Sequence, residues 1–376
     1  KLEYRGYDSS GIAILSDKGI ELNKCKGEIK NLENMIAGRV PSGTCGIGHT
    51  RWATHGAPSD VNSHPHMDQS GRVALVHNGI VENYVELKEA LINEHGIKFK
   101  SETDSEVIAQ LVGVKYNANG GDLEKAVYDA TKEMRGTYAI GVIAEDTPNK
   151  IVAYRKEAPL IAGLGKKSNF IASDIPALLK YTNDIFLIEN DEMVICTPDS
   201  ITIKDKDGKE VKREAMKITW SVEDAEKGGY EHFMLKEINE QPKVVAETLN
   251  RRIDEDGKIK LDGINLTKEE LDKYNKIYIV ACGTAYHAGL VGKYVIEKMA
   301  GIAVEVDVAS EFRYRDPFID EKTLFIAISQ SGETLDTLMS LRLAKEKGAR
   351  VLSVVNVVGS SIARESDDVF YTWAGP

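Results

Sequence analysis

The sequence predicts two domains of different fold class: a layered α+β domain followed by a doubly wound α/β domain. Three observations lead to this prediction. The chain has 376 residues, enough for two or three domains of ordinary size. The first half mixes short apolar runs, hairpin turns and amphipathic helical patterns. The last third alternates short apolar runs with helical patterns, which is typical of a parallel sheet.

In the first domain, short runs of apolar or β-branched residues bounded by Gly, Asn or Asp predict strands. The predicted strands cover residues 12–15, 73–76, 138–144, 151–154, 170–173, 186–188, 193–197, 201–205 and 211–218. Apolar residues at helical spacing predict helices, which cover residues 84–94, 105–116 and 123–134. The predicted domain spans residues 1–218.

A linker is predicted over residues 219–243, because Glu, Asp, Lys and Gly dominate residues 223–229. A helix is expected from about residue 233 to 251, interrupted near Pro242. The second domain is predicted over residues 244–376. Its strands are predicted at 277–281, 304–308, 324–328 and 351–355, and its helices at 284–299, 334–347 and 360–365.

Composition and charge exclude several classes of protein. The net charge of −11, from 59 acidic and 48 basic residues, argues against a nucleic-acid-binding groove. No apolar run is long enough to span a bilayer. Cys25, Cys45, Cys196 and Cys282 lie far apart and form no CxxC pair, so neither a zinc site nor a disulfide framework is indicated. We therefore expect a cytoplasmic protein with no metal or organic cofactor and with neither nucleic acid nor membrane as a partner.

A hydroxyl-rich loop follows the predicted strand 324–328. It reads Ser-Gln-Ser-Gly-Glu-Thr over residues 329–334, where a helix is predicted to begin. Helix N–H groups and hydroxyls can hold a phosphate, and Gly332 lets the backbone approach the ligand. Helix capping by Ser or Thr is the alternative interpretation of this segment alone. A second glycine turn over residues 282–285 occupies the same strand-to-helix position and favours a ligand site.

Five of the eight histidines fall between residues 49 and 77. A metal site is disfavoured, because the spacings match no known ligand pattern. A type I′ hairpin turn at Asn78-Gly79 is a second interpretation. A third is a polar pocket for an amino acid. In that pocket Arg51 would hold a carboxylate, Asp104 would pair with an α-ammonium, and Asn78 with the Gly79 N–H would donate to an oxyanion.

These motifs carry a family resemblance that covers nearly the whole chain. Residues 281–284, 311–315 and 329–334 resemble the first sugar isomerase (SIS) domain of the glutamine–fructose-6-phosphate aminotransferase family. The segments that resemble the glutaminase domain of the same family, in family order, are 2–9, 49–56, 62–66, 77–80 and 101–104. The resemblance favours the amino-acid pocket. It implies an α+β N-terminal-nucleophile glutaminase fold followed by a SIS fold.

The resemblance also implies roles for individual residues. The glutamine-binding residues would be Arg51, Trp52, Thr54, His55, His64 and Asp104. Asn78 and Gly79 would form the oxyanion hole, and Arg5 and Gly6 would lie near the nucleophile. His49 and His66 are expected to be structural. The sugar-phosphate-binding residues would be Thr284, Ser329, Gln330, Ser331 and Thr334. Ala285 stands where the family often has Ser, so one hydrogen bond to the sugar is missing or supplied elsewhere.

The activity implied by the resemblance is the conversion of glutamine and fructose 6-phosphate to glutamate and glucosamine 6-phosphate. The nucleophile of such enzymes is an N-terminal cysteine whose own α-amine acts as the base. The chain begins at Lys1, so we expect that cysteine to lie in an absent N-terminal stretch. A second SIS domain, with the Lys and Glu of the isomerase chemistry, is expected beyond residue 376. The chain alone is expected to be inactive, and the family forms homodimers through its SIS domains.

Three other functions were weighed against this one. A non-catalytic SIS protein that senses sugar phosphates would explain residues 329–334 but would leave Arg51 and Asn78-Gly79 without a purpose. An N-terminal-nucleophile amidotransferase of the phosphoribosyl-pyrophosphate or asparagine type would explain the first half but carries no SIS domain. A sugar deglycase shares the SIS architecture but lacks the glutaminase motifs.

Overall fold

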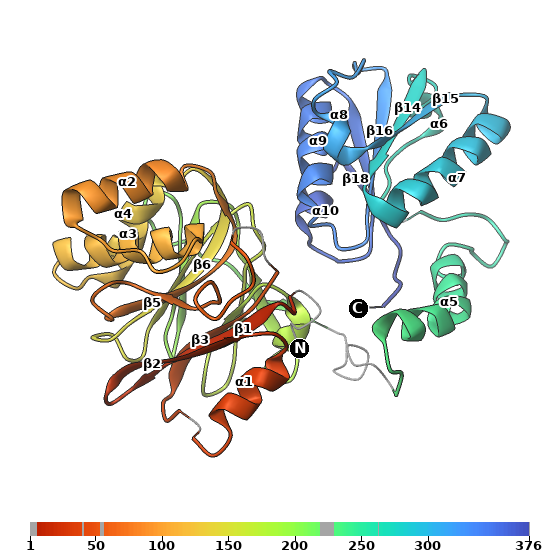
Figure 1. The fold of residues 1–376 in the computed structure, drawn as a ribbon. Coiled ribbons are helices and arrows are strands. Elements are labelled where there is room, and N and C mark those ends of the chain that lie inside the picture. Colours follow the sequence, from red (N-terminus) through yellow and green to blue (C-terminus); the bar gives the residue numbers. More distant parts are fainter. Residues whose placement is uncertain (1–5, 40, 53–55, 219–228, 262, 376) are drawn as a thin grey trace. The chain divides into compact units, whose positions relative to one another are not determined.

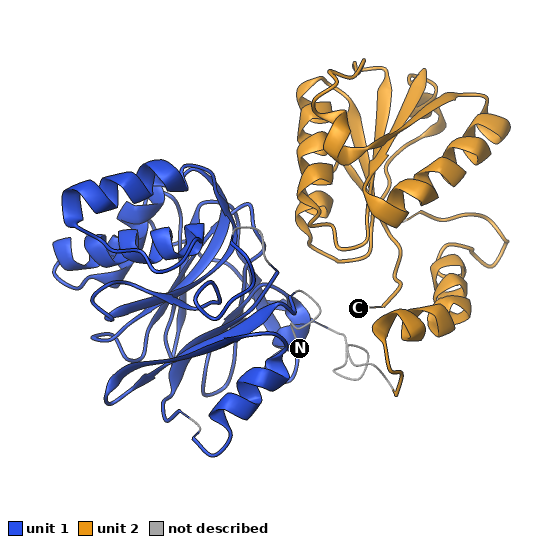
Figure 2. Ribbon diagram, viewed as in Figure 1, with its two compact units in different colours: residues 1–219 blue, residues 220–376 orange. Residues whose placement is uncertain are grey.

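The computed structural model describes residues 6–39, 41–52, 56–218, 229–261 and 263–375. The chain divides into two compact units, unit 1 over residues 1–219 and unit 2 over residues 220–376 (Figure 2). Among the described residues, no helix is long and apolar enough to cross a membrane.

Unit 1 is built around an antiparallel sheet of six strands in the order β12-β11-β7-β6-β5-β4 (Figure 1). These strands are β4 (His66–Met67), β5 (Val73–Val81), β6 (Gly136–Ala144), β7 (Ile151–Lys156), β11 (Glu192–Cys196) and β12 (Ile201–Lys204). One face is covered by α2 (Tyr84–His95), α3 (Asp104–Ala118) and α4 (Leu123–Glu133). Successive side chains of a strand point to opposite faces. Accordingly, Val73 and Leu75 join the core under the helices, whereas Ala74 joins a different core.

Two smaller sheets cover the opposite face of the six-stranded sheet. The first, in the order β2-β1-β3, consists of β1 (Ser9–Ser16), β2 (Gly19–Lys26) and β3 (Cys45–Arg51). The second, in the order β13-β10-β8-β9, consists of β8 (Ile161–Leu164), β9 (Phe170–Ala172), β10 (Asp184–Leu187) and β13 (Met216–Lys217). Ala13 and Ile47 pack with Ala74 in one core, and Ala162 packs with Ala153 in another. Helix α1 (Ile29–Ile36) contacts β1 and β2.

Unit 2 contains a fully parallel sheet of five strands in the order β15-β14-β16-β17-β18. They are β14 (Lys276–Ala281), β15 (Ala303–Val308), β16 (Thr323–Ser329), β17 (Arg350–Val355) and β18 (Asp368–Tyr371). Helix α7 (Gly283–Ala300) lies on one face, and α8 (Ala309–Phe312), α9 (Leu335–Glu346) and α10 (Ser361–Glu365) lie on the other (Figure 1). Helices α5 (Phe233–Asn250) and α6 (Lys268–Leu271) precede the sheet.

The predicted fold classes are confirmed: unit 1 is a layered α+β domain, and unit 2 is a doubly wound α/β domain. The hairpin interpretation of Asn78-Gly79 is wrong. Both residues lie inside β5, where Asn78 pairs with Ala139 and Gly79 with Tyr138 of β6. A two-residue turn preference is a local tendency, and here the long ladder between β5 and β6 overrides it.

Two further expectations differ from the structure. Helix α5 is not interrupted and continues on both sides of Pro242. No side chain of α5 is buried, so water can reach the carbonyl that proline leaves without its helical partner. The strand predicted over 211–218 is reduced to the two residues of β13. The Arg213 side chain, which donates to both carboxylate oxygens of Glu192 at 2.8 Å, anchors the rest of that segment.

Candidate functional site

The His-rich motif brings together the end of β3 and the middle of β5. These two strands belong to different sheets of unit 1 and contact each other. Nε2 of His49 on β3 lies 2.7 Å from Oδ1 of Asn78 on β5. Gly79 follows Asn78 and is exposed, whereas the preceding His77 is buried. The two residues predicted to form an oxyanion hole therefore lie where β5 passes from the core of unit 1 to its surface.

Gly79 cannot be replaced by a residue with a side chain without local rearrangement. Its φ angle is 115°, which residues with a Cβ rarely adopt. A Cβ at this position would also lie 2.0 Å from the carbonyl oxygen of Thr137 on β6. The β5–β6 ladder thus holds the main chain of Gly79 in one conformation.

Arg51 ends β3 and is buried, with 4% of its surface exposed. Its Nη2 donates to the carbonyl oxygen of Gly56 at 2.9 Å, and its Nη1 lies 3.9 Å from Oδ1 of Asp8. Gly6 packs against the same residue, since a Cβ there would lie 2.5 Å from the carbonyl carbon of Arg51. The structure thus places Gly6 and Asp8 beside Arg51. Asp8 had no predicted role, although it belongs to the motif over residues 2–9 that carries the resemblance.

Asp104 is the first residue of α3 and is 3% exposed. Its Oδ2 accepts a hydrogen bond from the Val81 N–H at 3.0 Å and lies 3.9 Å from Nδ1 of His77. The Thr103 side chain caps α3 by accepting from the Glu106 N–H. The partial positive charge at a helix N-terminus stabilises a carboxylate there. The hydrogen bond to Val81, which lies two residues after Gly79 at the end of β5, therefore fixes the position of the Asp104 carboxylate.

Four histidines pack next to this site. The His64 ring stacks on His49 with centroids 4.2 Å apart and meets His66 edge to face at 5.0 Å. Nδ1 of His64 accepts from the His77 N–H at 3.4 Å. Burial lowers the pKa of His49 and lowers those of His64 and His66 well below the ordinary value, so these rings are neutral at pH 7. The described residues include no group of three or more His, Cys, Asp or Glu placed to hold a metal ion.

The remaining residues predicted to bind glutamine are at or beyond the limit of what the structure describes. Trp52 is 60% exposed and packs against Tyr7 in a T-shaped contact with ring centroids 5.2 Å apart. Arg5, Thr54 and His55 lie outside the described residues. The structure therefore places Gly6 beside Arg51 at the end of β3, Asn78 and Gly79 within β5, and Asp104 at the start of α3, with the His64 ring stacked on His49 of β3.

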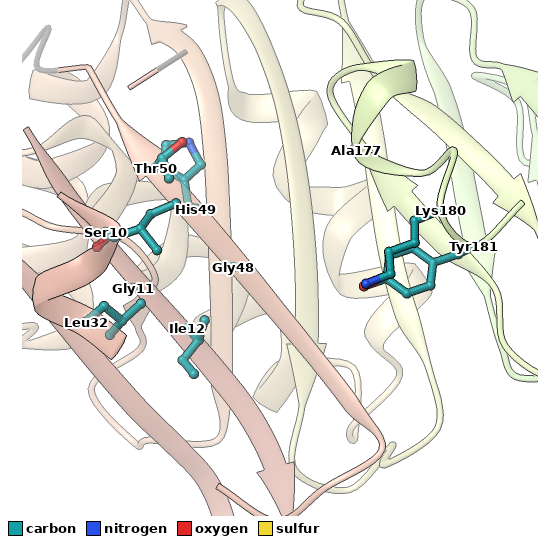
Figure 3. Close-up of a pocket in the computed structure, with 11 residues that line it drawn as sticks. Ser10, Gly11, Ile12, Leu32, Gly48, His49, Thr50, Ala177, Lys180 and Tyr181 are labelled. Carbon is teal, nitrogen blue, oxygen red and sulfur yellow. The ribbon is translucent and has the colours of Figure 1, made fainter. Parts of the chain in front are cut away.

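Unit 1 also contains a cavity of about 470 Å³ between β1, β3, α1 and residues 177–181. Figure 3 shows β1 and β3 on one side and Lys180 with Tyr181 on the other. The lining includes His49 but none of the described residues predicted to bind glutamine. The cavity therefore does not coincide with the predicted amino-acid pocket, although His49 borders the cavity and contacts Asn78.

Three of the four cysteines are poor nucleophiles. Burial raises the pKa of the Cys25 thiol, raises that of Cys45 to about 11 and raises that of Cys196 to about 12. A cysteine attacks as its thiolate, so these protonated thiols are inert at neutral pH. All four cysteines are free, and Cys282 is the N-cap residue of α7.

The predicted sugar-phosphate residues gather at the carboxyl edge of the sheet of unit 2. β14 and β16 are parallel neighbours, and Ala281 pairs with Ile328 at their ends. The chain leaves β14 through α7 toward β15 on one side and leaves β16 through α9 toward β17 on the other. Such a reversal opens a crevice at the strand ends. Thr284, exposed in the first turn of α7, and residues 329–334 flank it.

Hydrogen bonds within residues 329–334 hold the loop in a compact turn. Oγ of Ser329 accepts from the Gly332 N–H at 3.1 Å and lies 3.0 Å from Oγ1 of Thr334. Oγ of Ser331 accepts from the Glu333 N–H at 3.2 Å. Thr334 is the N-cap residue of α9, but its side chain makes no capping hydrogen bond. The first N–H groups of α9 and three hydroxyls therefore share one turn, as the sequence predicts.

Two other side chains of this loop have clear positions. The Glu333 carboxylate accepts from the N–H and the hydroxyl of Ser361, both at 2.8 Å. The Glu333 carboxylate is thus directed to the start of α10, where the helix N-terminus stabilises a negative charge. The residue Gln330 is exposed, and its main-chain carbonyl oxygen accepts from the main-chain N–H of Asn356 at 3.0 Å.

Comparisons with known proteins give a domain family for a part of each unit. Residues 49–180 match the glutamine amidotransferase domain family, and residues 270–376 match the SIS domain family. Glutamine–fructose-6-phosphate aminotransferases (isomerizing) match along the whole chain. The protein from Clostridium tetani is 60% identical over 376 residues, that from Caldanaerobacter subterraneus 57% over 376, and that from Thermus thermophilus 50% over 377.

Each of these matches covers 100% of this chain and 61% of the relative, so the chain spans about three fifths of the length of the curated relatives. The two domain families occur in this chain in the same order as units 1 and 2, which agrees with the whole-chain similarity to these aminotransferases. The chain therefore carries a glutamine amidotransferase domain followed by a SIS domain and is a homologue, along its whole length, of the glutamine–fructose-6-phosphate aminotransferases.

Proposed function

We propose that the whole protein transfers the amide nitrogen of glutamine to fructose 6-phosphate and so forms glucosamine 6-phosphate and glutamate. The observation that carries this proposal is the 50–60% identity to aminotransferases of that name over all of this chain. In this proposal unit 1 binds glutamine and releases its nitrogen as ammonia. Unit 2 binds the phosphate of the sugar that accepts the nitrogen.

In unit 1, the buried Arg51 guanidinium would hold the α-carboxylate of glutamine, since it is planar, permanently charged and able to donate twice. Asp104, a fixed buried carboxylate, would pair with the α-ammonium. Attack on the side-chain amide places a negative charge on its oxygen. The Asn78 amide and the Gly79 N–H would donate to that oxygen, and one such donor contributes about 3 kcal/mol to lowering the barrier.

The attacking group in this proposal is an N-terminal cysteine of the whole protein, with its own α-amine as the base. An α-amine has an ordinary pKa near 8 and can accept the thiol proton at neutral pH. Cys25, Cys45 and Cys196 do not suit this role because burial raises the pKa of each thiol. A thioester forms as ammonia leaves, and water then hydrolyses the thioester to glutamate.

In unit 2, Ser329, Gln330, Ser331 and Thr334 would bind the sugar phosphate, and Thr284 would contribute from α7. The support for this assignment is the reversal of the strand connections between β14 and β16, where open α/β sheets bind ligands, together with the start of α9, whose N-cap side chain makes no capping hydrogen bond. We further propose that the whole protein is a cytoplasmic homodimer assembled through its SIS domains, as the resemblance implies.

Isothermal titration of the whole protein tests the two-site proposal. Glutamine and fructose 6-phosphate should each bind at one site per chain, whereas unphosphorylated fructose should bind much more weakly. Arg51→Ala should weaken glutamine binding roughly 30-fold and leave fructose 6-phosphate binding unchanged, and Ser331→Ala should weaken fructose 6-phosphate binding about tenfold and leave glutamine binding unchanged. Loss of both signals in either variant, or equal affinity for fructose and its phosphate, would contradict the assignment.

A further inference from the structure

The contact between His49 and Asn78 links two β-sheets of unit 1 at the predicted oxyanion site. His49 is held by β3, in which it pairs with Gly11 of β1, and Asn78 is held by β5, in which it pairs with Ala139 of β6. Nε2 of His49 lies 2.7 Å from Oδ1 of Asn78, a short distance for a neutral hydrogen bond. The two side chains are therefore fixed relative to each other by the backbone of both sheets.

The surroundings of His49 determine which ring nitrogen carries the proton. Nδ1 of His49 is buried and, within the part of the chain that the structure describes, has no hydrogen-bond partner. A proton on Nδ1 would create a buried N–H donor without an acceptor, and Nε2 would then need a donor from Asn78. With the proton on Nε2, the one N–H of the neutral ring is satisfied by Oδ1 of Asn78. The Nε2–H form is therefore favoured.

The orientation of the Asn78 amide follows from this donor. Once Oδ1 accepts from His49, the amide NH₂ group lies on the other side of the side-chain carbon. It is then available to donate to a ligand. A flipped amide would present Oδ1 to the developing negative charge of the reaction and would repel it. Preorganised donors act best when their direction is set before the reaction begins.

We propose that His49 is a positioning residue for the oxyanion hole, which fixes the Asn78 amide with its NH₂ group directed toward the scissile amide of glutamine. This inference rests on the proposed glutaminase function of unit 1. It assigns His49 a role in the reaction, beyond the structural one expected from the sequence. His64 supports the arrangement, since its ring stacks on that of His49 at 4.2 Å with an interplanar angle of 23°.

The test uses the whole protein and two substitutions of His49. His49→Phe keeps an aromatic ring to stack on His64 but removes the donor. His49→Gln keeps an N–H donor of similar reach. We expect His49→Phe to lower kcat for glutamine hydrolysis between about tenfold and hundredfold, with KM for glutamine changed less than about threefold. Synthesis from free ammonia should stay at the wild-type rate, and His49→Gln should recover most of the lost kcat.

A double-mutant cycle with Asn78→Ala separates positioning from general loss of structure. If His49 acts through Asn78, adding either His49 substitution to Asn78→Ala should lower kcat no further. Should unit 1 of His49→Phe fail to fold, as judged by hydrogen-exchange protection of β3 and β5, the cycle with His49→Gln gives the same comparison.

The results that would overturn the inference differ from those that would overturn the proposed function. Wild-type kcat in His49→Phe, no recovery in His49→Gln, or a full additional loss in the Asn78→Ala background would overturn the role of His49. If the wild-type protein does not hydrolyse glutamine, the proposed glutaminase function is wrong, and the inference about His49 is wrong with it.

Discussion

The two candidate sites are built in opposite ways. The site in unit 1 depends on buried charged and aromatic side chains, which come from β3, β5, α3 and the segment before β4. The site in unit 2 depends on main-chain N–H groups and hydroxyls at the edge of one parallel sheet. If the proposed sites are right, recognition in unit 1 should be concentrated in a few groups, whereas recognition in unit 2 should be shared among several weaker donors.

The largest expected effect is that of Gly79→Ala in unit 1. The new Cβ would lie 2.0 Å from the Thr137 carbonyl oxygen at a φ of 115°, so β5 must shift. We expect a loss of about 3 kcal/mol in the free energy of unfolding and loss of glutamine hydrolysis. Gly208→Ala is the matched control, because Gly208 has a positive φ of 79° with open space around it. Its loss in the free energy of unfolding, measured by urea denaturation, should stay at about 1 kcal/mol. An equal loss for Gly79→Ala and Gly208→Ala would contradict the steric argument.

The next largest effect is expected for Arg51→Ala. Losing charge-assisted hydrogen bonds to a carboxylate costs about 2 kcal/mol, so KM for glutamine should rise roughly 30-fold. Activity with free ammonia should change little, because the sugar site lies in the other unit. Arg135→Ala serves as the control, since Arg135 pairs with Glu86 on the surface. A parallel loss of ammonia-dependent activity in Arg51→Ala would refute its role in glutamine binding.

Acid should weaken unit 1 more than unit 2. Burial lowers the pKa of His49, His64 and His66 in the folded state, so below about pH 6.5 the unfolded chain binds protons that the folded chain does not. Stability is therefore full above pH 6.5 and falls as pH decreases, by about 1.4 kcal/mol per pH unit for each histidine that stays neutral.

The described histidines of unit 2, His232 and His287, are exposed, and none is buried in a cluster like that of unit 1. Hydrogen exchange in urea measures the protection of each unit separately. The rates at pH 7.5 and pH 5.5 are compared after correction for the effect of pH on the intrinsic exchange rate. An equal loss of protection in both units would show that the histidine cluster does not control the acid response.

The smallest effects are expected in unit 2, where the proposed site would share the phosphate among several donors. Ser331→Ala removes one hydrogen bond to a charged group, which should weaken fructose 6-phosphate binding about tenfold and spare glutamine hydrolysis. Ala285→Ser, in the first turn of α7, should strengthen binding by a few fold if a serine there reaches the sugar. Calorimetric titration measures both. A loss of more than a thousandfold from Ser331→Ala would show that recognition in unit 2 is concentrated in one residue, as in unit 1.

The same contrast explains how much of each site could be predicted from the sequence. β14 and β16 are continuous apolar runs followed by a glycine-containing turn and a helix, and parallel pairing places such turns at one edge. The crevice in unit 2 therefore follows from local patterns. β3 was not predicted, because its sequence, Cys-Gly-Ile-Gly-His-Thr-Arg, shows neither an apolar run nor a regular alternation.

The contacts of unit 1 depend on pairing between distant segments. His49 and Asn78 are 29 residues apart, and their hydrogen bond requires the packing of two sheets. Asn78-Gly79 has the composition of a hairpin turn, and only its pairing with β6 keeps it extended. The site residues in this unit could be named because the motifs resemble a family. Their arrangement could not be derived from spacing.

The most direct test of the account follows the nitrogen atom from one substrate to the other. The whole protein should be incubated with glutamine labelled with ¹⁵N at the side-chain amide, together with fructose 6-phosphate, and its products examined by mass spectrometry. We predict ¹⁵N in glucosamine 6-phosphate, with one glutamate formed for each amino sugar. Release of labelled ammonia and glutamate without any labelled amino sugar would contradict the claim that the two units serve one transfer reaction.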